Sequence, residues 1–304
     1  MRRRAVILVT GATGRVGYRL LEALADDRAE AVAMVRVEAK GLDLPGPGEN
    51  LVGTFDDPPA AEQLQAFDRV FLLSPSGETQ AELEIVFIDA LVAAGHRPNV
   101  VKMAADGFLD PGCDVRFMRS HREIARHLDA TGLPVSYLAP APYMEMLLPA
   151  ATAIRREATL YAPAGHGRVG FVAAADVADA AAQLLTGPVP PAGDDSAVFT
   201  LTGPDSLTYS NVASRISAVF ARQVRYADQP EDRAREELLG SGLAPWDAEG
   251  MLELYAWIRA GGAGQLTSHV REVTRHAPRG LDDWLEGSRA AFLEPLLDGA
   301  APTY

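Results

Sequence analysis

A glycine-rich loop near the start of the chain constrains its fold more than any other feature. The loop, Gly11-Ala12-Thr13-Gly14-Arg15-Val16-Gly17, follows the apolar run Ala5–Thr10 and opens a segment, Val16–Leu24, whose apolar residues recur at helical spacing. In such a loop the first glycine allows a tight turn, the second lets the backbone approach a pyrophosphate, and the third lets the helix pack closely on the strand. The pyrophosphate binds the N–H groups at the helix N-terminus. The sequence therefore predicts a dinucleotide-binding βαβ unit.

Apolar runs and helical segments alternate through the first part of the chain, as far as Pro140. Several of the runs are apolar throughout, as expected for strands that are covered on both faces of a sheet. Alternating strands and helices are typical of parallel sheets with crossover helices. The sequence therefore predicts an α/β fold with a Rossmann-type doubly wound parallel sheet, whose further strands are Ala31–Val35, Asn50–Thr54, Arg69–Leu73, Asn99–Met103 and Pro134–Leu138.

The pattern changes after Pro140, where helices and strands become mixed. We expect residues 1–155 to form the nucleotide-binding domain, with residues 168–202 returning to it, and residues 156–304 to form a smaller, mostly helical C-terminal substrate-binding lobe. No linker is long enough to separate the two parts, so a cleft between them is expected. The elements predicted here are the helix Tyr143–Ile154, the strand Val169–Val172, the helix Asp176–Leu185 and the strand Ala197–Leu201, followed by mostly helical residues from Tyr209 on.

The charge and the cysteine content of the chain exclude several classes of partner. A net charge of −13 argues against nucleic acid and anionic membranes, since both need a basic protein surface. No apolar run reaches the roughly 18 residues of a membrane span, and the single cysteine, Cys113, suits a cytoplasmic protein without internal disulfides. The histidines show no spacing typical of a metal site, so no metal is expected. The expected partner is a small-molecule substrate, and the expected assembly is a monomer or a homodimer.

The end of the second predicted strand distinguishes the two nicotinamide cofactors. NAD-binding sites carry an acidic residue there, about 20 residues past the glycine loop, which binds the ribose 2′-hydroxyl. This chain has Arg36 instead, with Lys40 close by. An arginine suits a 2′-phosphate because it makes planar, charge-assisted hydrogen bonds. The sequence thus predicts NADP(H) in preference to NAD(H), while Glu38 would oppose a phosphate if it pointed inward.

An ordered set of motifs resembles the NmrA-like family of atypical short-chain dehydrogenases/reductases along nearly the whole chain. The set begins with the glycine loop and Val35-Arg36, and its later members are Phe71-Leu72-Leu73-Ser74-Pro75, Thr131-Gly132-Leu133-Pro134, Val169-Gly170-Phe171-Val172, Asp176-Val177-Ala178 and Leu201-Thr202-Gly203-Pro204. Proteins of this family include NADPH-dependent quinone and azo-type reductases and also inactive regulators that sense the cofactor. The resemblance therefore implies the fold and the cofactor more firmly than the reaction.

Carried onto this sequence, the resemblance implies a set of cofactor-binding positions. The 2′-phosphate would lie against Arg36 and Lys40, and the adenosine ribose against Leu73 and Ser74. Lys102 would approach the nicotinamide ribose or the substrate. Lys40 and Lys102 are the only lysines of the chain, and both fall on implied ligand positions. The loop residues implied to touch the phosphates are Gly11, Thr13, Gly14, Arg15 and Val16.

The residues that protonate the substrate in typical members of the superfamily are missing here. The position of the lysine holds His121, and that of the tyrosine four residues earlier holds Phe117. Ala104 stands where a serine is expected after the fifth strand, and Ala139 where relatives carry an arginine before a proline. Since no Tyr/Lys/Ser acid system is present, the resemblance leaves the proton donor open.

Three residues are our candidates for catalysis, namely His121, Tyr143 and Lys102. A histidine with its unperturbed pKa of about 6.5 can give or take a proton near neutrality. Tyr143 follows the sixth predicted strand at the mouth of the cleft, and Lys102 ends the fifth. Contacts with the substrate are expected from Asp106 and Phe117, together with His121 and Tyr143.

Three functions are compatible with the sequence. The first, which we predict, is an NADPH-dependent reductase of a small conjugated or carbonyl-like acceptor such as a quinone, enone or imine. A quinone tolerates the missing tyrosine because water can protonate its reduced oxygen. The second is a non-redox lyase or cyclase that uses His121, Tyr143 or Asp106 as acid and base. The third is a regulatory protein that senses NADP(H). Consumption of NADPH distinguishes the first from the other two.

Overall fold

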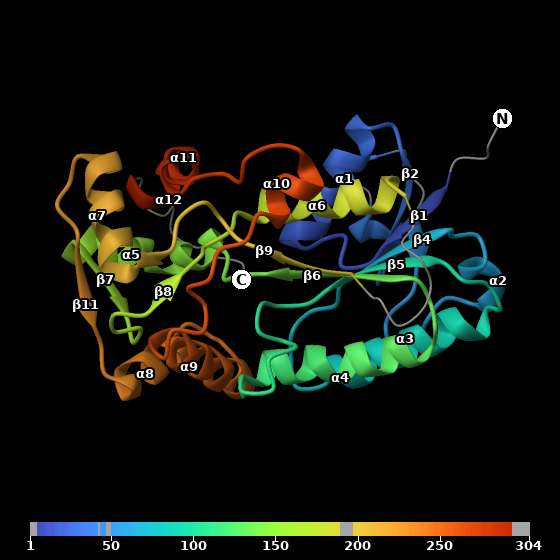
Figure 1. Cartoon of the computed structure of the whole chain (residues 1–304), viewed down its shortest axis with the longest axis horizontal. Coiled ribbons are helices and arrows are strands. Elements are labelled where there is room, and N and C mark those ends of the chain that lie inside the picture. Colours follow the sequence, from blue (N-terminus) through green and yellow to red (C-terminus); the bar gives the residue numbers. More distant parts are fainter. Residues whose placement is uncertain (1–4, 42, 47–49, 189–196, 294–304) are drawn as a thin grey trace.

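The computed structural model describes residues 5–41, 43–46, 50–188 and 197–293. Among these residues, seven parallel strands form a central sheet in the order β3-β2-β1-β4-β5-β6-β9 (Figure 1). The chain runs outward from β1 to β3 and returns to the other side of β1 with β4. This reversal leaves a crevice beyond the carboxyl ends of β1 and β4, where doubly wound sheets bind their ligands. The predicted Rossmann-type fold is confirmed. The strands are β1 (Val6–Val9), β2 (Glu30–Val35), β3 (Asn50–Val52), β4 (Arg69–Leu72), β5 (Asn99–Met103), β6 (Val135–Pro140) and β9 (Ala197–Leu201).

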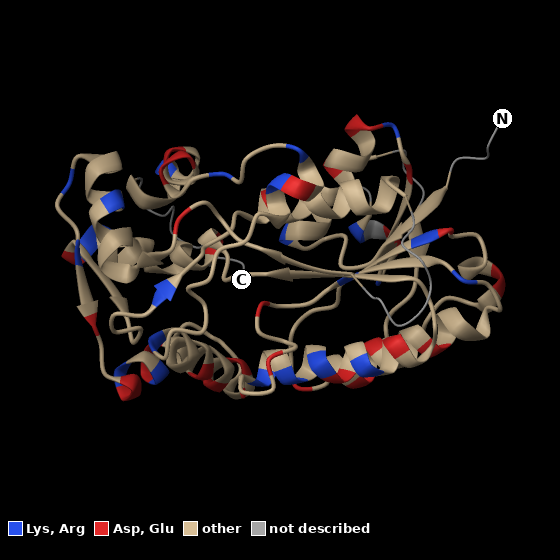
Figure 2. Cartoon of the chain, viewed as in Figure 1, with Lys and Arg blue, Asp and Glu red and all other residues tan. Residues whose placement is uncertain are grey.

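Two helical layers cover the sheet (Figure 1). On one face α1 (Arg15–Asp26) packs against α6 (Ala174–Thr186), which also contacts α10 (His269–Thr274). On the other face α3 (Gln80–Ala93) packs against α4 (Arg116–Ala130). Charged side chains gather on helices and loops and are few on the strands (Figure 2), because both faces of the sheet are buried. The short helices of this part are η1 (Glu38–Lys40) and α2 (Ala61–Leu64).

The remaining elements form a smaller lobe beside the sheet (Figure 1). It is rich in helices, as predicted, but it also holds two short sheets, in which β10 pairs antiparallel with β8 and β11 pairs parallel with β7. No helix in the described ranges is long and apolar enough to cross a membrane. The elements of the lobe are η2 (Met144–Ala150), α5 (Ala151–Glu157), β7 (Thr159–Ala162), β8 (Arg168–Val169), β10 (Leu207–Thr208), α7 (Tyr209–Phe220), β11 (Arg225–Asp228), α8 (Glu231–Gly240), α9 (Pro245–Arg259), α11 (Leu281–Gly287) and α12 (Arg289–Leu293).

Two predicted elements have a different extent in the structure. The segment Tyr143–Ile154 is not one α-helix, since the 3-10 helix η2 precedes α5 and contains Pro149, which cannot donate a backbone hydrogen bond. The predicted strand Val169–Val172 keeps only its first residue in β8. The backbone N–H of Gly170 donates instead to Ala263, in a different part of the lobe.

The segment 168–202 contributes to both parts of the molecule. Its last strand, β9, lies beyond β6 in the central sheet, and its helix, α6, lies against α1. The strand β8 of the same segment pairs with β10 outside that sheet. The division into residues 1–155, with 168–202 returning, and residues 156–304 is the one that we propose.

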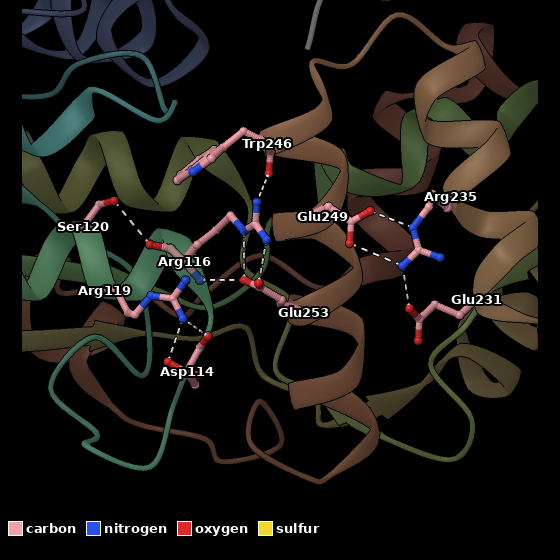
Figure 3. Close-up of polar contacts among 9 residues, drawn as sticks. All are labelled: Asp114, Arg116, Arg119, Ser120, Glu231, Arg235, Trp246, Glu249 and Glu253. Atoms are coloured by element: carbon pink, nitrogen blue, oxygen red, sulfur yellow. Dashed lines mark hydrogen bonds and ion pairs between the residues drawn. The ribbon is translucent and has the colours of Figure 1, made fainter.

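The helix α9 fastens the lobe to α4 (Figure 3). Arg116, at the start of α4, donates from its backbone N–H and its guanidinium to the Glu253 carboxylate at 2.8–3.1 Å. The guanidinium also donates to the Trp246 carbonyl at 3.0 Å and lies 5.4 Å from the centroid of the indole. Phe117 packs beside this indole, and a Cβ atom on Gly250 would lie 2.4 Å from the Phe117 ring. These contacts fix the position of α9 relative to α4.

Candidate active site

The glycine loop has a shape that only glycine permits at two positions. Gly11 has a φ of +62°, and a Cβ atom there would lie 2.7 Å from the carbonyl oxygen of Leu73. A Cβ atom on Gly17 would lie 2.2 Å from the oxygen of Gly11. Gly14 is the N-cap of α1, which has no side-chain cap and no acidic residue in its first turn. The first N–H groups of α1 are therefore suited to bind a phosphate.

Thr10 connects this loop to the end of β4. Its hydroxyl donates to the carbonyl oxygens of Phe71 and Leu73 at 3.0 and 2.9 Å, and it accepts the N–H of Leu73 at 2.8 Å. The two loops that border the crevice are thus held together by one side chain. The sequence analysis did not single out Thr10, although a threonine directly before such a loop offers a hydroxyl at this place.

The charged residues after β2 lie on the surface. Arg36 directly follows the strand, and Glu38 and Lys40 belong to η1; all three side chains are exposed. Arg36 and Lys40 are therefore accessible to a 2′-phosphate, and Glu38 is equally exposed.

A buried polar cluster lies between β5, α3 and α4, and we define it as Ser74, Gln80, Glu84, Lys102 and His121. The Nζ atom of Lys102 lies 2.9 and 3.1 Å from the two carboxylate oxygens of Glu84, and it also donates to the Met103 carbonyl. Its distance to Nδ1 of His121 is 3.5 Å. Ser74 and Gln80 donate to the same oxygen of Glu84 at 2.7 and 3.3 Å. The cluster brings together three of the predicted site residues, Ser74, Lys102 and His121.

Burial controls the charge of this cluster. Burial lowers the pKa of Lys102, whereas the neighbouring Glu84 carboxylate raises it. Burial also lowers the pKa of His121 well below the usual value, and the positive charge of Lys102 lowers it further. His121 is therefore neutral at physiological pH and can donate a hydrogen bond, but it does not act there as a cationic acid. The expectation that His121 has an unperturbed pKa is therefore wrong.

Tyr143 lies between the end of β5 and the glycine loop. Its hydroxyl donates to the sulfur of Met103 at 3.8 Å. Burial raises the pKa of Tyr143, as does the charge of Glu145, whereas Arg15 lowers it. The charge of Arg15, the first residue of α1, is thus within electrostatic range of the phenol. The phenol is thus a neutral and very weak acid.

The other two predicted substrate residues have different surroundings. Asp106 follows β5, where its backbone N–H donates to the Pro140 carbonyl at 2.9 Å, and burial raises the pKa of its carboxyl to about 6. This carboxyl lies at the carboxyl edge of the sheet, as expected of a group near the substrate. Phe117, in contrast, packs against Trp246 of α9. Its contacts indicate a role in holding the lobe.

Glu84 and Gln80 are the polar residues of the cluster that the sequence analysis missed. Val86 of the same helix is 44% exposed, whereas Glu84 is fully buried. The spacing of Gln80, Glu84 and Ile88, four residues apart each time, marks the face that is buried. The sequence signal was present, but a lone glutamate in a helix more often faces water.

Asp176 does not cap its helix, since Ala173 is the N-cap of α6. Its buried carboxylate accepts the backbone N–H of Arg279 at 2.8 Å and pairs with the guanidinium of the same residue, which also binds Asp179. Asp176, Asp179 and His276 each offer a ligand atom within 4.8 Å of the others. Because the guanidinium of Arg279 pairs with both carboxylates, we assign this group a structural role.

A cavity of about 190 Å³ opens in the lobe, and the first of its lining residues follows shortly after Tyr143 in the sequence. That residue is Met146, and its backbone N–H donates to the Tyr143 carbonyl at 3.0 Å. Tyr209 and Tyr255 line the cavity together with aliphatic side chains, and its polar lining includes Glu237. Its lining is more apolar than polar, and its volume is smaller than the roughly 300–1,000 Å³ of most small-molecule sites.

Comparisons with known proteins show the family of this chain. The sequence model described as NAD(P)H-binding matches residues 11–188. The chain is similar to an NAD(P)H azoreductase of Xenophilus azovorans, with 30% identity over 94% of this chain and 99% of that protein. It is also 30% identical, over the same shares, to a (4-alkanoyl-5-oxo-2,5-dihydrofuran-3-yl)methyl phosphate reductase of Streptomyces griseus. Its fold is similar to that of an NADPH-dependent quinone oxidoreductase of Escherichia coli crystallised with NADPH, with a TM-score of 0.81, 23% identity, and coverage of 92% of this chain and 99% of that one.

Proposed function

The chain belongs to the NAD(P)H-binding family, within the NmrA-like type of atypical short-chain dehydrogenases/reductases, and on that premise we propose that it is an NADPH-dependent reductase of a small conjugated or carbonyl-like acceptor. It is an NAD(P)H-dependent oxidoreductase. The finer proposal concerns the acceptor, which we take to be a quinone, an enone or an imine, and the preference for NADPH.

One observation carries the choice of acceptor: His121 and Tyr143 are both held in neutral, weakly acidic forms. Hydride transfer to a plain ketone places a negative charge on oxygen, which needs a strong acid nearby. A quinone or a conjugated acceptor spreads that charge, so that a neutral hydrogen bond and water suffice. A crevice with weak proton donors therefore favours acceptors that are easily reduced.

A further observation supports this class of substrate. The names of the two relatives at 30% identity concern azo compounds and a carbonyl-substituted dihydrofuran, both of which are conjugated. We assign the cofactor phosphates to the N-terminus of α1 and the 2′-phosphate to Arg36 and Lys40. When bound, NADPH supplies the hydride, while His121 and Tyr143 offer hydrogen bonds to the acceptor.

The test is a panel of acceptors incubated with the full chain and NADPH, followed by the loss of the absorbance of the reduced nicotinamide. Quinones, enones and imines should be reduced, whereas saturated ketones should not. The control is Gly14→Val, which puts a side chain where the pyrophosphate must approach the backbone and should abolish NADPH binding with the fold intact by circular dichroism. Oxidation of NADPH by none of the acceptors would refute the proposed substrate class.

The role of His121 is tested by His121→Phe. Loss of one hydrogen-bond donor to a developing negative charge costs about 10²–10³-fold in rate. Enone and imine turnover should therefore fall strongly, and quinone turnover only weakly, because a reduced quinone spreads its charge over the conjugated ring. Equal losses on both classes would assign the hydrogen bond to another group, with Tyr143 the next to be substituted.

A further inference from the structure

The ion pair of Glu84 and Lys102 has no direct part in the proposed reaction. Both side chains are buried, at 0 and 1% exposure, and Nζ of Lys102 lies within 3.1 Å of both carboxylate oxygens. Such a pair gives up the hydration of two charges, and apolar residues of similar volume are often as stable. Stability alone therefore gives a weak reason for a charged pair at this place. Its position, between β5 and the α3–α4 layer, suggests that it orients a neighbour.

The neighbour is His121. Nζ of Lys102 is shared among the Glu84 carboxylate, the Met103 carbonyl and Nδ1 of His121, the last at 3.5 Å. An ammonium group has only donors, so a ring nitrogen that faces it presents its lone pair. The hydrogen of the neutral ring then lies on Nε2, on the side away from Lys102. His121 as a whole residue is 9% exposed.

We propose that Glu84 is a positioning residue that, through Lys102, keeps His121 in the tautomer with its hydrogen on Nε2, the atom that donates to the acceptor. The carboxylate keeps the buried amine in its ammonium form and fixes its direction. Without Glu84, the desolvated amine loses its proton and can accept a hydrogen bond from Nδ1–H, so the two tautomers become comparable. This inference rests on the proposed function, because His121 is the hydrogen-bond donor there.

Nitrogen NMR of the full chain tests the tautomer without any acceptor. With ¹⁵N-labelled histidine, the shifts of the two ring nitrogens of His121 distinguish Nε2–H from Nδ1–H. The wild-type ring should be the Nε2–H tautomer, and both Glu84→Gln and Lys102→Met should give a mixture. Glu82→Gln, on the exposed side of the same helix, is the matched control, and the ring of His127, paired with Asp89 on the surface, is the internal one.

Kinetics provides the second measurement. Glu84→Gln should lower kcat for an enone by about tenfold, a part of what loss of the donor costs, while KM and quinone turnover change little. If Glu84→Gln fails to fold, the double variant Glu84→Met/Lys102→Met removes both charges and is expected to fold, since no uncompensated charge remains. It should show the same tautomer mixture and the same loss of kcat.

Three results overturn the proposal: a wild-type ring with its hydrogen on Nδ1, ring shifts that no variant changes, or an unchanged kcat in a variant whose tautomer has changed. A correct tautomer response in a protein that reduces no acceptor would overturn the proposed function and leave the tautomer control standing. Different results would therefore refute the tautomer control and the proposed function.

Discussion

Arg36 is the side chain on which the choice between the two cofactors depends at the scale of single residues. It is exposed directly after β2, with Lys40 at the end of η1. Arg36→Ala should weaken NADPH binding by about 10–100-fold, since a charge-assisted hydrogen bond contributes about 1.5–3 kcal/mol. NADH binding should stay nearly the same. Calorimetry with both cofactors measures this, and Arg19→Ala, an exposed position within α1, is the control. Tighter binding of NADH by the wild type would mean that Glu38 faces the ribose.

Asp106 predicts a pH dependence of stability. Burial raises the pKa of its carboxyl to about 6. A raised pKa means that the folded chain binds the proton more tightly than the unfolded one, so the associated stability is present below the unfolded pKa and is lost as pH rises through about 6. Asp106→Asn should therefore raise Tm at about pH 8 and change it much less at about pH 4, near the unfolded pKa of an aspartate. Melting curves of both proteins at the two pH values test this, and an equal Tm change at both would exclude titration of Asp106 as its cause.

Residues whose role depends on local geometry could be predicted from the sequence, and those that depend on distant partners could not. Gly11 and Gly17 were correctly identified, and the structure adds that the packing of the loop itself requires them. The partner of Lys102 was not predicted, because Glu84 lies on another element, 18 residues earlier in the chain. The shifted pKa of His121 was missed for the same reason, since burial and a nearby ammonium cause it.

At the scale of elements, the contact of α4 with α9 contributes to the stability of the fold (Figure 3). Arg116 and Glu253 are mostly buried there, with 19 and 31% of their side chains exposed. Arg116→Met should lower the free energy of unfolding by about 1 kcal/mol, allowing for this exposure. Arg119→Met is the matched control, since its pair with Asp114 is exposed and should contribute little. Urea unfolding of both variants measures the difference, and equal losses would show that the Arg116 contacts add nothing specific.

The elements themselves were predictable where the pattern is local. The strands of the central sheet and the helix α1 follow from apolar runs and helical spacing. The small sheet of β7 and β11 was missed because its strands are short and pair across the lobe, at Thr159 with Arg225. The single helix expected after Tyr143 was wrong because its apolar spacing concealed the break at Pro149.

The order of the strands predicts the behaviour of fragments at the scale of the whole molecule. A fragment of residues 1–155 would lack β9 and α6, and would expose the edge of β6 and the outer side of α1. An uncovered parallel edge pairs with other chains, so this fragment should aggregate. A fragment of residues 1–204 keeps both elements and should aggregate less. Size-exclusion chromatography with light scattering compares the two, and a monomeric 1–155 fragment would contradict the prediction.

The place of β9 at the edge of the sheet has a consequence for synthesis in the cell. Its last residue is number 201 of 304, so the strand that completes the sheet leaves the ribosome after the glycine loop and all other strands of that sheet. Until β9 has been synthesised, one edge of β6 remains unpaired while the first helices of the lobe leave the ribosome. Long-range strand pairing of this kind is slow and leaves apolar surface uncovered. The nascent chain should therefore depend on chaperones during the interval between the synthesis of β6 and that of β9.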